Sequence, residues 1–422
     1  MDETVFVKKA RSAGARVFRV GGCVRDACMG RAPKDRDYLL CGMEEQAFHR
    51  LFPEARQVGQ SFPVFLLDIG GETCEVSFAR RERKSGSGYC GFKVAFSSDV
   101  TVEEDLYRRD TTMNSMAWEL PEERLIDPYG GQRDVKAGLV RAVSEHFAED
   151  PVRALRAARQ SAELDFKITE ETFSYMACCK EELLGEPQER IFHEMALSLQ
   201  ARKPSVFFRN LQRAGLLQAV FPELHALIGQ EQPVEFHPEG DAFEHVLLVL
   251  DAVSRETSDV SARFAALVHD IGKGRTPKEM LPHHYGHEIA GYDVLLEWSH
   301  RMTLPKLWLQ KAEFVIKEHM RAPRLAKHRK IAALLMSLSK SKVSVEEFQS
   351  IIRADHGSLP EYLLHAKEYI MAMQEVSGAE CPSHLHGKEI GDWIFSEQVA
   401  AYQRKRKDSG NVNKRCGFDR NS

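Results

Sequence analysis

The pattern of apolar and polar positions changes once along the chain. Up to about residue 140, short apolar runs are separated by Gly, Ser and Asp, which is typical of strands between turns. The predicted strands are Val17–Val20, Tyr38–Cys41, Val64–Asp68 and Glu75–Phe78. From Glu149 onward, apolar residues recur with the spacing of amphipathic helices. The pattern therefore predicts an α+β protein, with an α/β head followed by an almost entirely helical remainder.

The chain of 422 residues is too long for one hydrophobic core, so we expect several domains. Gln230–Gly240, rich in Pro, Gly and Glu, is a predicted linker, and a second helical unit is expected to start near Asp241. The predicted domains are the head at 1–140, a helical region at 141–230, a second helical domain at 242–355 and a helical tail at 356–422. The basic and polar end, Arg404–Ser422, is typical of a solvated terminus that frays.

Composition narrows the class of protein. With 43% hydrophobic residues, 28% charged residues and a net charge of -4, the chain is typical of a globular protein, and any nucleic-acid contact must come from local patches. The longest apolar run, around Val246–Leu250, is too short to cross a bilayer, and the acidic start does not resemble a secretory signal. The nine cysteines are scattered and odd in number, which favours reduced thiols. We expect a cytoplasmic protein without membrane contact.

Asp35 and Asp37 form the first candidate site. Because strand side chains alternate between faces, both carboxylates are expected on one side of the strand that ends at Cys41. Two neighbouring carboxylates repel each other, and Mg²⁺ is the usual cation that offsets this cost. Glu75, on another predicted strand, is the expected third carboxylate. Taken singly, the Asp pair is more typical of a solvated loop, and Glu75 could be an ordinary exposed strand residue.

A segment suited to an anion precedes these acids. Gly21-Gly22 allows close backbone approach, and Val24–Met29 is predicted to be a short helix whose N-terminus would face phosphate. Arg25 adds a permanently charged guanidinium. A glycine pair alone is more often a simple turn. Together with the two acids, however, it predicts metal-assisted phosphoryl or nucleotidyl transfer.

A third candidate site is the segment Glu149–Arg156, in which we expect a helix with acidic residues in its first turn and Pro151 at its start. Asp150 and Arg153 are three residues apart and would share a helix face. A carboxylate only accepts hydrogen bonds and a guanidinium only donates them. Since cytosine and adenine both present an amino donor beside a ring-nitrogen acceptor, this pair suits C and A. The alternative is a row of salt bridges on a solvated helix.

Read in order, the motifs GGCVRD, DRD, DLYRRDTTMN, IDPYGGQRD and EDPVRALRAAR resemble the class II tRNA nucleotidyltransferases, the CCA-adding enzymes, over about the first 220 residues. These enzymes share their polymerase-β-like head with bacterial poly(A) polymerases. The resemblance implies that Asp35 and Asp37 are catalytic Mg²⁺ ligands, and we add Glu75 as the third catalytic carboxylate. The implied nucleotide-binding residues are Gly21, Gly22, Arg25, Arg109 with Arg108 beside it, Asp110, Asn114, Glu149, Asp150, Arg153, Arg156 and Arg159. Glu149 is expected to steady Arg153.

The stretch between Glu75 and Asp105 is rich in Gly, Ser and charged residues and is predicted to be a mobile loop. In the resembled family, a flexible loop here is needed to add the final A. The sequence VGQSFPVFLLDI is closer to CCA-adding enzymes than to poly(A) polymerases, and the chain lacks the strongly basic tail of the latter. Poly(A) polymerase and an enzyme that adds only the A remain the alternatives.

A further site, separate from those described above, is expected in the helical half. The order H…HD…D, spanning roughly residues 242 to 355, resembles the HD-domain metal phosphohydrolases. The resemblance implies His245, His269, Asp270 and Asp355 as ligands of a divalent metal such as Ni²⁺, Mn²⁺ or Mg²⁺, with hydrolysis of phosphate esters such as 2′,3′-cyclic phosphates. Further histidines, at His284, His287 and His319, stay unassigned. A single histidine on such a helix is more often a core or surface residue.

The sequence as a whole predicts an enzyme that adds C, C and A to tRNA from CTP and ATP, with a second phosphohydrolase activity. Its expected partners are tRNA, ATP and CTP, and we expect a monomer or a homodimer. One alternative is an HD phosphohydrolase whose head serves only as an RNA-binding module. The intact Asp35 and Asp37 pair weighs against that alternative.

Overall fold

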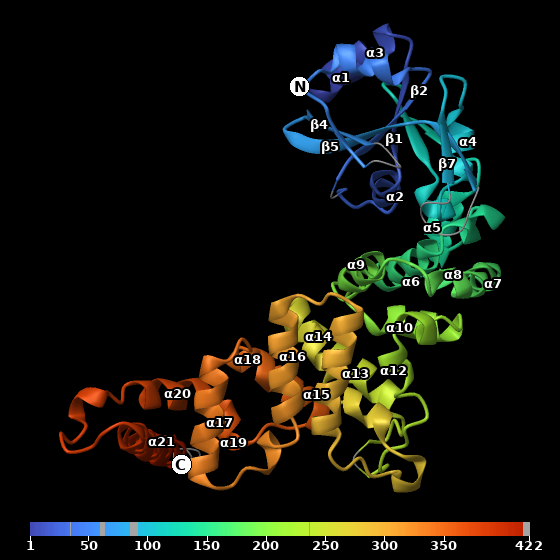
Figure 1. Ribbon diagram of the computed structural model, residues 1–422. Helices are drawn as coiled ribbons and strands as arrows, with labels where there is room; N and C mark the ends of the chain where they lie inside the picture. The colour runs from blue at the N-terminus through green and yellow to red at the C-terminus, as the bar shows by residue number, and fades with distance from the viewer. Residues whose placement is uncertain (34, 60–63, 85–91, 236, 417–422) are drawn as a thin grey trace, which may run out of the picture. The chain divides into compact units, whose positions relative to one another are not determined.

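The computed structural model describes residues 1–33, 35–59, 64–84, 92–235 and 237–416 of the chain (Figure 1). It divides into two units, Met1–Pro222 and Glu223–Ser422. The first unit contains a mixed α/β head, and the second is helical, so the predicted α+β fold class is confirmed. Among the described helices, none has the length and apolar composition needed to span a membrane.

The head is built on a seven-stranded sheet in which β2 and β5 are parallel neighbours and the other neighbouring pairs are antiparallel. The strand order is β3 (Arg56–Val58), β4 (Val64–Ile69), β5 (Glu72–Phe78), β2 (Asp37–Cys41), β1 (Arg16–Val20), β8 (Ala117–Leu120) and β9 (Arg124–Ile126). All four predicted strands are present, each extended by one to three residues. Buried and exposed residues alternate along β4 and β5, which explains why the apolar pattern of the sequence predicts these strands.

Two hydrophobic cores cover the faces of this sheet. On one face, α1 (Glu3–Ser12) and α3 (Glu45–Leu51) pack against the strands, with Phe48 and Phe65 in ring contact at 5.1 Å (Figure 1). On the other face, α4 (Val102–Tyr107) contributes Val102 and Leu106 to a second buried cluster. Asp37 is the first residue of β2, whereas Glu75 lies in the middle of β5 with its side chain exposed, so neither carboxylate is part of these cores.

The predicted mobile loop between Glu75 and Asp105 is largely replaced by a two-stranded antiparallel sheet. This sheet pairs β6 (Arg80–Lys84) with β7 (Phe92–Phe96). The residues that join the two strands, 85–91, lie outside the described part of the chain. The prediction missed these strands because β6 is an unbroken run of charged residues, which has none of the apolar alternation that identifies a strand.

The rest of the first unit is mostly helical. Its elements are α2 (Gly22–Cys28), η2 (Thr112–Asn114), α5 (Gly131–Ala137), β10 (Leu139–Val140), η3 (Glu145–Glu149), α6 (Val152–Leu164), β11 (Lys167–Ile168), α7 (Glu170–Cys178), α8 (Lys180–Leu183), α9 (Gln188–Ser198), α10 (Ser205–Arg213) and α11 (Leu217–Val220). Helix α6 packs on both α9 and α10 and has nine buried residues, so it is the central helix of this region.

The second unit is a bundle of helices joined by short turns. Its elements, beginning with a helix that starts at the last residue of the first unit, are α12 (Pro222–His225), α13 (Ala242–Glu256), α14 (Val260–Val268), η4 (Ile271–Arg275), η5 (Lys278–Met280), α15 (His287–Arg301), α16 (Lys306–Glu318), η6 (Ala322–Arg324), α17 (His328–Lys340), α18 (Val345–His356), α19 (Glu361–Leu364), α20 (Ala366–Gln374), η7 (Gly378–Glu380) and α21 (Lys388–Cys416). Helix α13 starts where expected, because Asp241 caps it by accepting hydrogen bonds from the backbone of Phe243 and Glu244.

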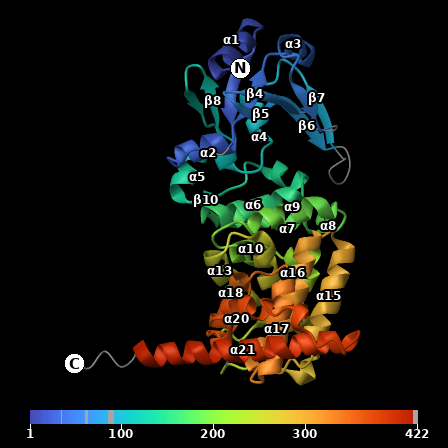
Figure 2. The same cartoon turned by 90° about the vertical axis from the view of Figure 1, so that its left-hand side faces the viewer.

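The C-terminal segment does not fray at Arg404 as expected. It continues the single helix α21 through Cys416, and residues 417–422 lie outside the described part of the chain (Figure 2). Helix α21 packs on α17 and α20, where Tyr402 is fully buried. Arg406 is also held, since its guanidinium bonds to Glu361 and His328. Contacts such as those of Tyr402 and Arg406 therefore stabilise the helix in a region whose basic composition predicted a frayed end.

Candidate functional site

The acidic centre of the head consists of Asp35, Asp37 and Glu75, and the register between β2 and β5 places two of these residues side by side. Asp37 is the first residue of β2 and lies directly beside Glu75 of the parallel strand β5. Burial, together with the negative charges of Glu75 and Asp35, raises the pKa of Asp37 to about 6. Burial and the neighbouring negative charges thus both disfavour the charged form of Asp37. This is the electrostatic condition for binding a divalent cation through oxygen ligands.

Asp35 lies outside the strand that was expected to carry it. The strand begins at Asp37, and Asp35 is exposed in a bend two residues before it. The prediction that the strand includes Asp35 was therefore wrong, and alternation along the strand does not decide where the Asp35 carboxylate points. Its charge nevertheless acts on Asp37, so the two acids are electrostatic neighbours.

The expected anion-binding segment forms a helix that starts earlier than predicted. Helix α2 begins at Gly22, and Gly21 precedes it with a positive φ of 74°, a conformation that favours glycine. A Cβ atom at Gly21 would lie 3.5 Å from Nη1 of Arg109 and 3.8 Å from Oδ2 of Asp37. The glycine backbone therefore stands between the acidic centre and a guanidinium. This arrangement can bring a triphosphate close to both.

Three arginines around this point are held by acceptors rather than left mobile. Arg25 donates to Asn114 at 2.9 Å and to Asp26 at 2.7 Å. Arg108 and Arg109 bond to opposite oxygens of the buried Asp105, at 2.5 and 3.1 Å. Burial alone would raise the pKa of Asp105, but these two positive charges lower it. The ionised carboxylate therefore orients both guanidinium groups.

Asp110 has the same supporting role for Arg156. It is buried and accepts hydrogen bonds from Arg156 at 2.8 Å, from Gln160 at 3.1 Å and from the backbone of Thr111 at 2.8 Å. Burial alone would raise the pKa of Asp110, but Arg156 and the Thr111 N–H hold it well below its usual range. Asp110 thus fixes a residue of α6 to the segment that follows α4.

These residues surround a pocket of about 440 Å³. It is lined by Val20, Gly21, Gly22, Asp37, Val64, Glu75, Ser77, Arg80, Arg108, Arg109, Asp110, Asn114, Asp150, Arg153, Arg156 and Arg190. Four sequence-predicted residues are not part of this lining as far as the chain is described: Arg25, Asp35, Glu149 and Arg159. Arg159 instead bonds to Glu194 and Glu163. The lining combines carboxylates with guanidinium groups, which suits a metal-bound triphosphate.

The predicted start of the base-reading helix was wrong. Glu149 closes the 3-10 helix η3, Asp150 is extended, Pro151 is the N-cap, and α6 starts at Val152. The Asp150 side chain can therefore accept from the Val152 N–H, which it does at 3.2 Å. Asp150 and Arg153 both line the pocket. Asp150, however, precedes the N-cap of α6 whereas Arg153 lies within the helix, so the two do not share one helix face.

The partners of this pair also differ from the expectation. Glu149 bonds to the ring Nδ1 of His146 at 2.9 Å, and Arg153 donates to the His146 carbonyl oxygen at 2.6 Å. Both oxygens of Asp150 accept hydrogen bonds from the guanidinium group of Arg190 on α9, at 3.1 and 3.2 Å. Sequence reasoning missed Arg190 because it lies 40 residues away and belongs to no recognised motif.

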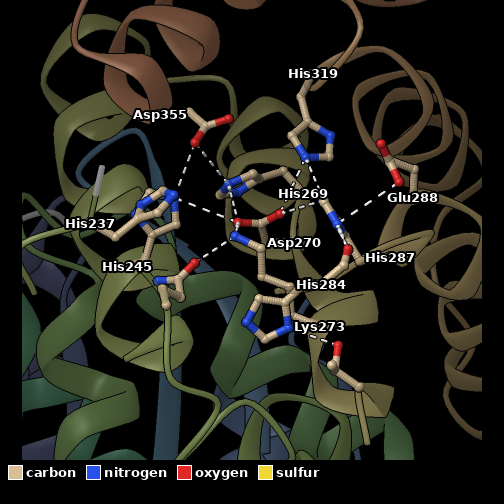
Figure 3. A network of polar contacts seen from close by, with 12 residues as sticks. His237, His245, His269, Asp270, Lys273, His284, His287, Glu288, His319 and Asp355 are labelled. Carbon is tan, nitrogen blue, oxygen red and sulfur yellow. Dashed lines mark hydrogen bonds and ion pairs between the residues drawn. The ribbon is translucent and has the colours of Figure 1, made fainter. Parts of the chain in front are cut away.

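A second polar centre lies inside the second unit. Six side chains carried by five helices or their ends meet there, and each is 9% exposed or less (Figure 3). They are His245 on α13, His269 and Asp270 directly after α14, His287 on α15, His319 directly after α16 and Asp355 on α18. The structure therefore brings together the four predicted ligands His245, His269, Asp270 and Asp355, whose donor atoms lie within 4.8 Å of one another.

Close backbone packing brings these helices together. A Cβ atom on Gly272 would lie 2.0 Å from the carbonyl oxygen of His287 and 2.4 Å from the backbone nitrogen of Gly291. Only glycine fits at that distance, so η4 and α15 touch through their backbones. The contact holds Asp270 next to His287. Gly272, two residues after Asp270, is thus a packing requirement of the site.

Strong mutual charge stabilisation is present in this centre. Burial alone would lower the pKa of His269, but the carboxylates of Asp270 and Asp355 raise it to about 10. Burial would raise the pKa of Asp270 and Asp355, yet the surrounding cationic groups hold both well below the usual range. Lys273 adds its ammonium 2.5 Å from Oδ2 of Asp270. The buried Nε2 of His269 has no hydrogen-bond partner, as is expected of a nitrogen that serves as a metal ligand.

The predicted linker contributes two residues that were not anticipated. Glu239 accepts a hydrogen bond from Nδ1 of His245 at 2.6 Å, and His237 lies 3.3 Å from the same carboxylate oxygen. By contrast, the unassigned His284 uses its two ring nitrogens on Thr276 and on the Glu231 carbonyl oxygen. His284 is therefore already satisfied, whereas His287 and His319 join the buried centre.

Three family models match successive parts of the chain: "Poly A polymerase head domain" over residues 17–141, "Probable RNA and SrmB-binding site of polymerase A" over 165–228 and "HD domain" over 242–375. The multifunctional CCA protein of Nitrosococcus oceani is 44% identical over 307 residues, which cover 72% of this chain and 74% of the relative. That of Methylococcus capsulatus is 45% identical over 310 residues, covering 72% of each chain.

Solved structures share the fold at lower identity. A CCA-adding enzyme in complex with ATP superposes with a TM-score of 0.63 at 21% identity, covering 95% of this chain and 90% of the other. A tRNA nucleotidyltransferase complexed with a primer tRNA and an incoming ATP analogue gives a TM-score of 0.59 at 20% identity, covering 87% and 98%. The architecture described above is therefore that of CCA-adding enzymes.

Proposed function

Since the chain belongs to the family of multifunctional CCA proteins, we propose that it adds C, C and A to the 3′ end of tRNA, using CTP and ATP. We further propose that the HD domain hydrolyses phosphate esters at a separate metal site. The observation that carries the first proposal is the strand register that sets Asp37 beside Glu75, at the wall of a pocket also lined by arginines. Carboxylate oxygens suit a divalent cation and guanidinium groups suit phosphate, so this lining fits nucleotidyl transfer.

The three acids Asp35, Asp37 and Glu75 are the proposed Mg²⁺ ligands, and their oxygen donors fit that ion. Bound Mg²⁺ supplies polarisation of the attacking 3′ hydroxyl and of the triphosphate oxygens. The chain itself positions the reactants. Arg109, fixed by Asp105, and the backbone around Gly21 hold the triphosphate near the acids. Because Arg109 is oriented before the nucleotide arrives, little ordering is needed at the moment of reaction.

Selection of C and A is proposed to use Asp150 and Arg153, both of which line the pocket. A carboxylate would accept from the exocyclic amino group, and a guanidinium would donate to the adjacent ring nitrogen. Arg190, which bonds to both oxygens of Asp150, holds that carboxylate in position. Uracil and guanine present the reverse pattern and would leave these groups unpaired, which is costly in a partly buried site.

The proposed phosphohydrolase site uses His245, His269, Asp270 and Asp355. Imidazole and carboxylate ligands suit divalent transition metals such as Ni²⁺ or Mn²⁺. The bound metal supplies an activated water, and Lys273 would place a positive charge next to an anionic ester. The proposed substrates are 2′,3′-cyclic phosphates and related esters at RNA ends. We also propose a cytoplasmic protein that works as a monomer or a homodimer.

Two narrower alternatives concern the head. An enzyme that adds only the A, or a poly(A) polymerase, would use the same acids and the same pocket. The residues 85–91 of the loop that the resemblance links to addition of the final A lie outside the described part of the chain. Full CCA addition is favoured because the curated relatives are named multifunctional CCA proteins.

The deciding experiment incubates the protein with tRNAs that lack all three, the last two or only the last of the terminal C, C and A nucleotides. Each tRNA is given CTP, ATP or both, and product lengths are read on a sequencing gel. Full CCA addition predicts completion of all three substrates with both nucleotides. Extension of only the tRNA that lacks A would identify an A-adding enzyme, and long A tails would identify a poly(A) polymerase.

A further inference from the structure

Three aromatic side chains lie together beside the nucleotide pocket, although none of the three belongs to its lining. Tyr107 is the last residue of α4, Tyr129 lies between β9 and α5, and His146 lies in η3. The ring centroid of Tyr107 is 5.3 Å from that of His146 and 5.6 Å from that of Tyr129. We call these three residues the aromatic cluster.

Backbone pairing explains why the rings of Tyr107 and His146 meet. Thr111 and Ala142 form an antiparallel bridge, and next to it the N–H of Thr112 donates to the carbonyl oxygen of Arg141 at 2.9 Å. The segment that follows α4 is thereby held against the segment that precedes η3. In an antiparallel register, the residue four positions before Thr111 lies opposite the residue four positions after Ala142. These two residues are Tyr107 and His146.

The aromatic cluster is joined to two parts of the pocket wall. Tyr107 directly precedes Arg108 and Arg109, both of which line the pocket. The carbonyl oxygen of His146 accepts a hydrogen bond from Arg153 at 2.6 Å, and Arg153 also lines the pocket. The cluster therefore lies next to the arginine proposed to hold the triphosphate and next to the arginine proposed to read the base.

Two of the three rings are open to solvent. Tyr107 is 37% exposed, and the side chain of His146 is 40% exposed. Tyr129 instead packs against the second buried cluster of the head, and its hydroxyl donates to the carbonyl oxygen of Glu103 at 2.9 Å. The ring of His146 is held through Nδ1, which lies 2.9 Å from Glu149. The cluster is thus fixed from behind, while Tyr107 and His146 keep free ring surface.

A nucleotidyl-transfer site must receive the end of an RNA chain as well as a nucleotide. The 3′ hydroxyl of that chain has to reach Asp37 and Glu75, so its last unpaired bases must lie beside the same pocket. Aromatic side chains bind unpaired bases by stacking, which every base allows. Because the planes of Tyr107 and His146 are inclined by 81°, a base can stack on one ring and set its edge against the other.

We propose that Tyr107 and His146 form a stacking surface for an unpaired base near the 3′ end of the tRNA. This proposal rests on the proposed nucleotide addition and identifies the residues that hold the end of the RNA. Stacking tolerates any base, so the same surface serves each successive 3′ end as C, C and A are added.

Steady-state kinetics with a tRNA that lacks only its terminal A tests the proposal. Tyr107→Ala should raise the KM for this tRNA by about 10-fold, while the KM for ATP and kcat stay unchanged. Tyr107→Trp keeps a ring and should keep the wild-type KM, whereas Tyr107→Leu keeps only apolar bulk and should behave like Tyr107→Ala. His146→Ala should raise the same KM. Tyr285→Ala, which removes an exposed tyrosine of the second unit, is the matched control.

A binding measurement gives a reading that needs no catalysis. Fluorescence anisotropy compares two RNA hairpins that copy the acceptor stem of tRNA, one with unpaired 3′ nucleotides and one with a blunt end. The wild type should bind the hairpin with unpaired nucleotides more tightly. Tyr107→Ala and Tyr107→Leu should remove most of this difference, and Tyr107→Trp should retain it.

Three results would overturn the proposal: an unchanged KM for tRNA in Tyr107→Ala, an equal loss in Tyr107→Trp, or a rise in the KM for ATP alone. The last result would place the base of the incoming nucleotide on these rings. If the wild type extends no tRNA at all, the proposed nucleotide addition fails, whereas the comparison of hairpins still decides whether the aromatic cluster holds an RNA end. Circular dichroism verifies that each variant is folded.

Discussion

The acidic centre of the head and the histidine centre of the HD domain meet the same requirement, a polar site for phosphate chemistry, in opposite ways. In the head, Glu75 is exposed and Asp37 half-buried, and the carboxylates face an open pocket lined by arginines. In the HD domain, every ligand of the centre is buried, and most donors are imidazole nitrogens. One site is made of hard oxygen ligands and the other mainly of nitrogen ligands.

The pKa shifts show what this difference means. The pKa of Asp37 is raised because burial and the neighbouring carboxylates Glu75 and Asp35 disfavour its charge. Burial alone would raise the pKa of Asp270 and Asp355, but the cationic groups around them hold both well below the usual range. The head site therefore brings like charges together, whereas the HD site pairs opposite charges.

The largest expected effect separates the two activities. Asp37→Ala should reduce nucleotide addition by about 10³-fold or more, because metal-ion stabilisation of a transition state is worth several kcal/mol. Hydrolysis of 2′,3′-cyclic AMP should stay unchanged, since it uses the HD site. The measurement is the initial rate of CMP incorporation into tRNA, compared with cyclic phosphate hydrolysis by the same preparation.

The matched control for this variant is Glu72→Ala, an exposed carboxylate on the same strand as Glu75. It should keep both rates near those of the wild type. Substantial tRNA extension by Asp37→Ala would contradict the assignment of the acidic centre. Loss of both activities in Asp37→Ala would instead mean that the two sites are not independent.

The reciprocal variant is His269→Ala, for which we expect hydrolysis to fall by about 10²-fold or more while addition is retained. Removal of His269 takes one imidazole from the proposed ligands of the HD site and breaks its contact with Asp270. His283→Gln is the control on the same unit. Retained hydrolysis in His269→Ala, with metal still bound at wild-type affinity, would remove this histidine from the ligand set.

How far the sequence predicts these two regions depends on local pattern. Strands β1, β2, β4 and β5 were predictable because apolar and polar residues alternate along them or form short apolar runs. The four proposed ligands of the HD domain were predicted because the order H…HD…D, with its adjacent His-Asp pair, is a recognisable signal. By contrast, the short strand β6 carries only charged residues and has no such signal.

The remaining errors concern side chains whose partners lie far away in the sequence. Arg190 orients Asp150 from a helix 40 residues later, and nothing in the spacing of either residue indicates it. Glu239 supports His245 from a segment that composition marks as a linker. Asp35 and Asp150 each lie just outside the regular element assigned to them, because a bend and a proline N-cap begin those elements later. Element ends are set by such single contacts rather than by periodicity.

A smaller effect is expected on base selection in the head. Asp150→Ala should lower the preference for CTP and ATP over UTP and GTP by about 10- to 100-fold, since one paired base contact discriminates by about 1–3 kcal/mol. The measurement is kcat/KM for each nucleotide with a tRNA that lacks its last nucleotides. Glu145→Ala, an exposed carboxylate in η3, is the control. An unchanged preference in Asp150→Ala would refute the base-reading assignment.

The smallest effect concerns the support of the HD site rather than its ligands. Asp259 caps α14, the helix that ends at His269, and accepts hydrogen bonds from the Ala262 N–H at 3.0 Å and from Lys311 at 3.0 Å. Burial alone would raise the pKa of Asp259, but these bonds and that from Ser261 lower it from 3.8 to about 2. The ionised carboxylate therefore stabilises the fold above about pH 4, and this contribution is lost as the pH falls toward 2.

We expect Asp259→Ala to reduce the free energy of unfolding at pH 7 by about 1 kcal/mol, the usual cost of losing an N-cap, with part of the charge term screened by solvent. Asp259→Asn keeps a capping oxygen and should lose less. Urea unfolding of each variant from pH 7 to pH 3 measures the difference from wild type, which should narrow below pH 4 for both. If the difference in the free energy of unfolding stayed constant from pH 7 to pH 3, ionisation of Asp259 would contribute nothing to the cap. The HD site, unlike the head, would then not depend on an ionised supporting carboxylate.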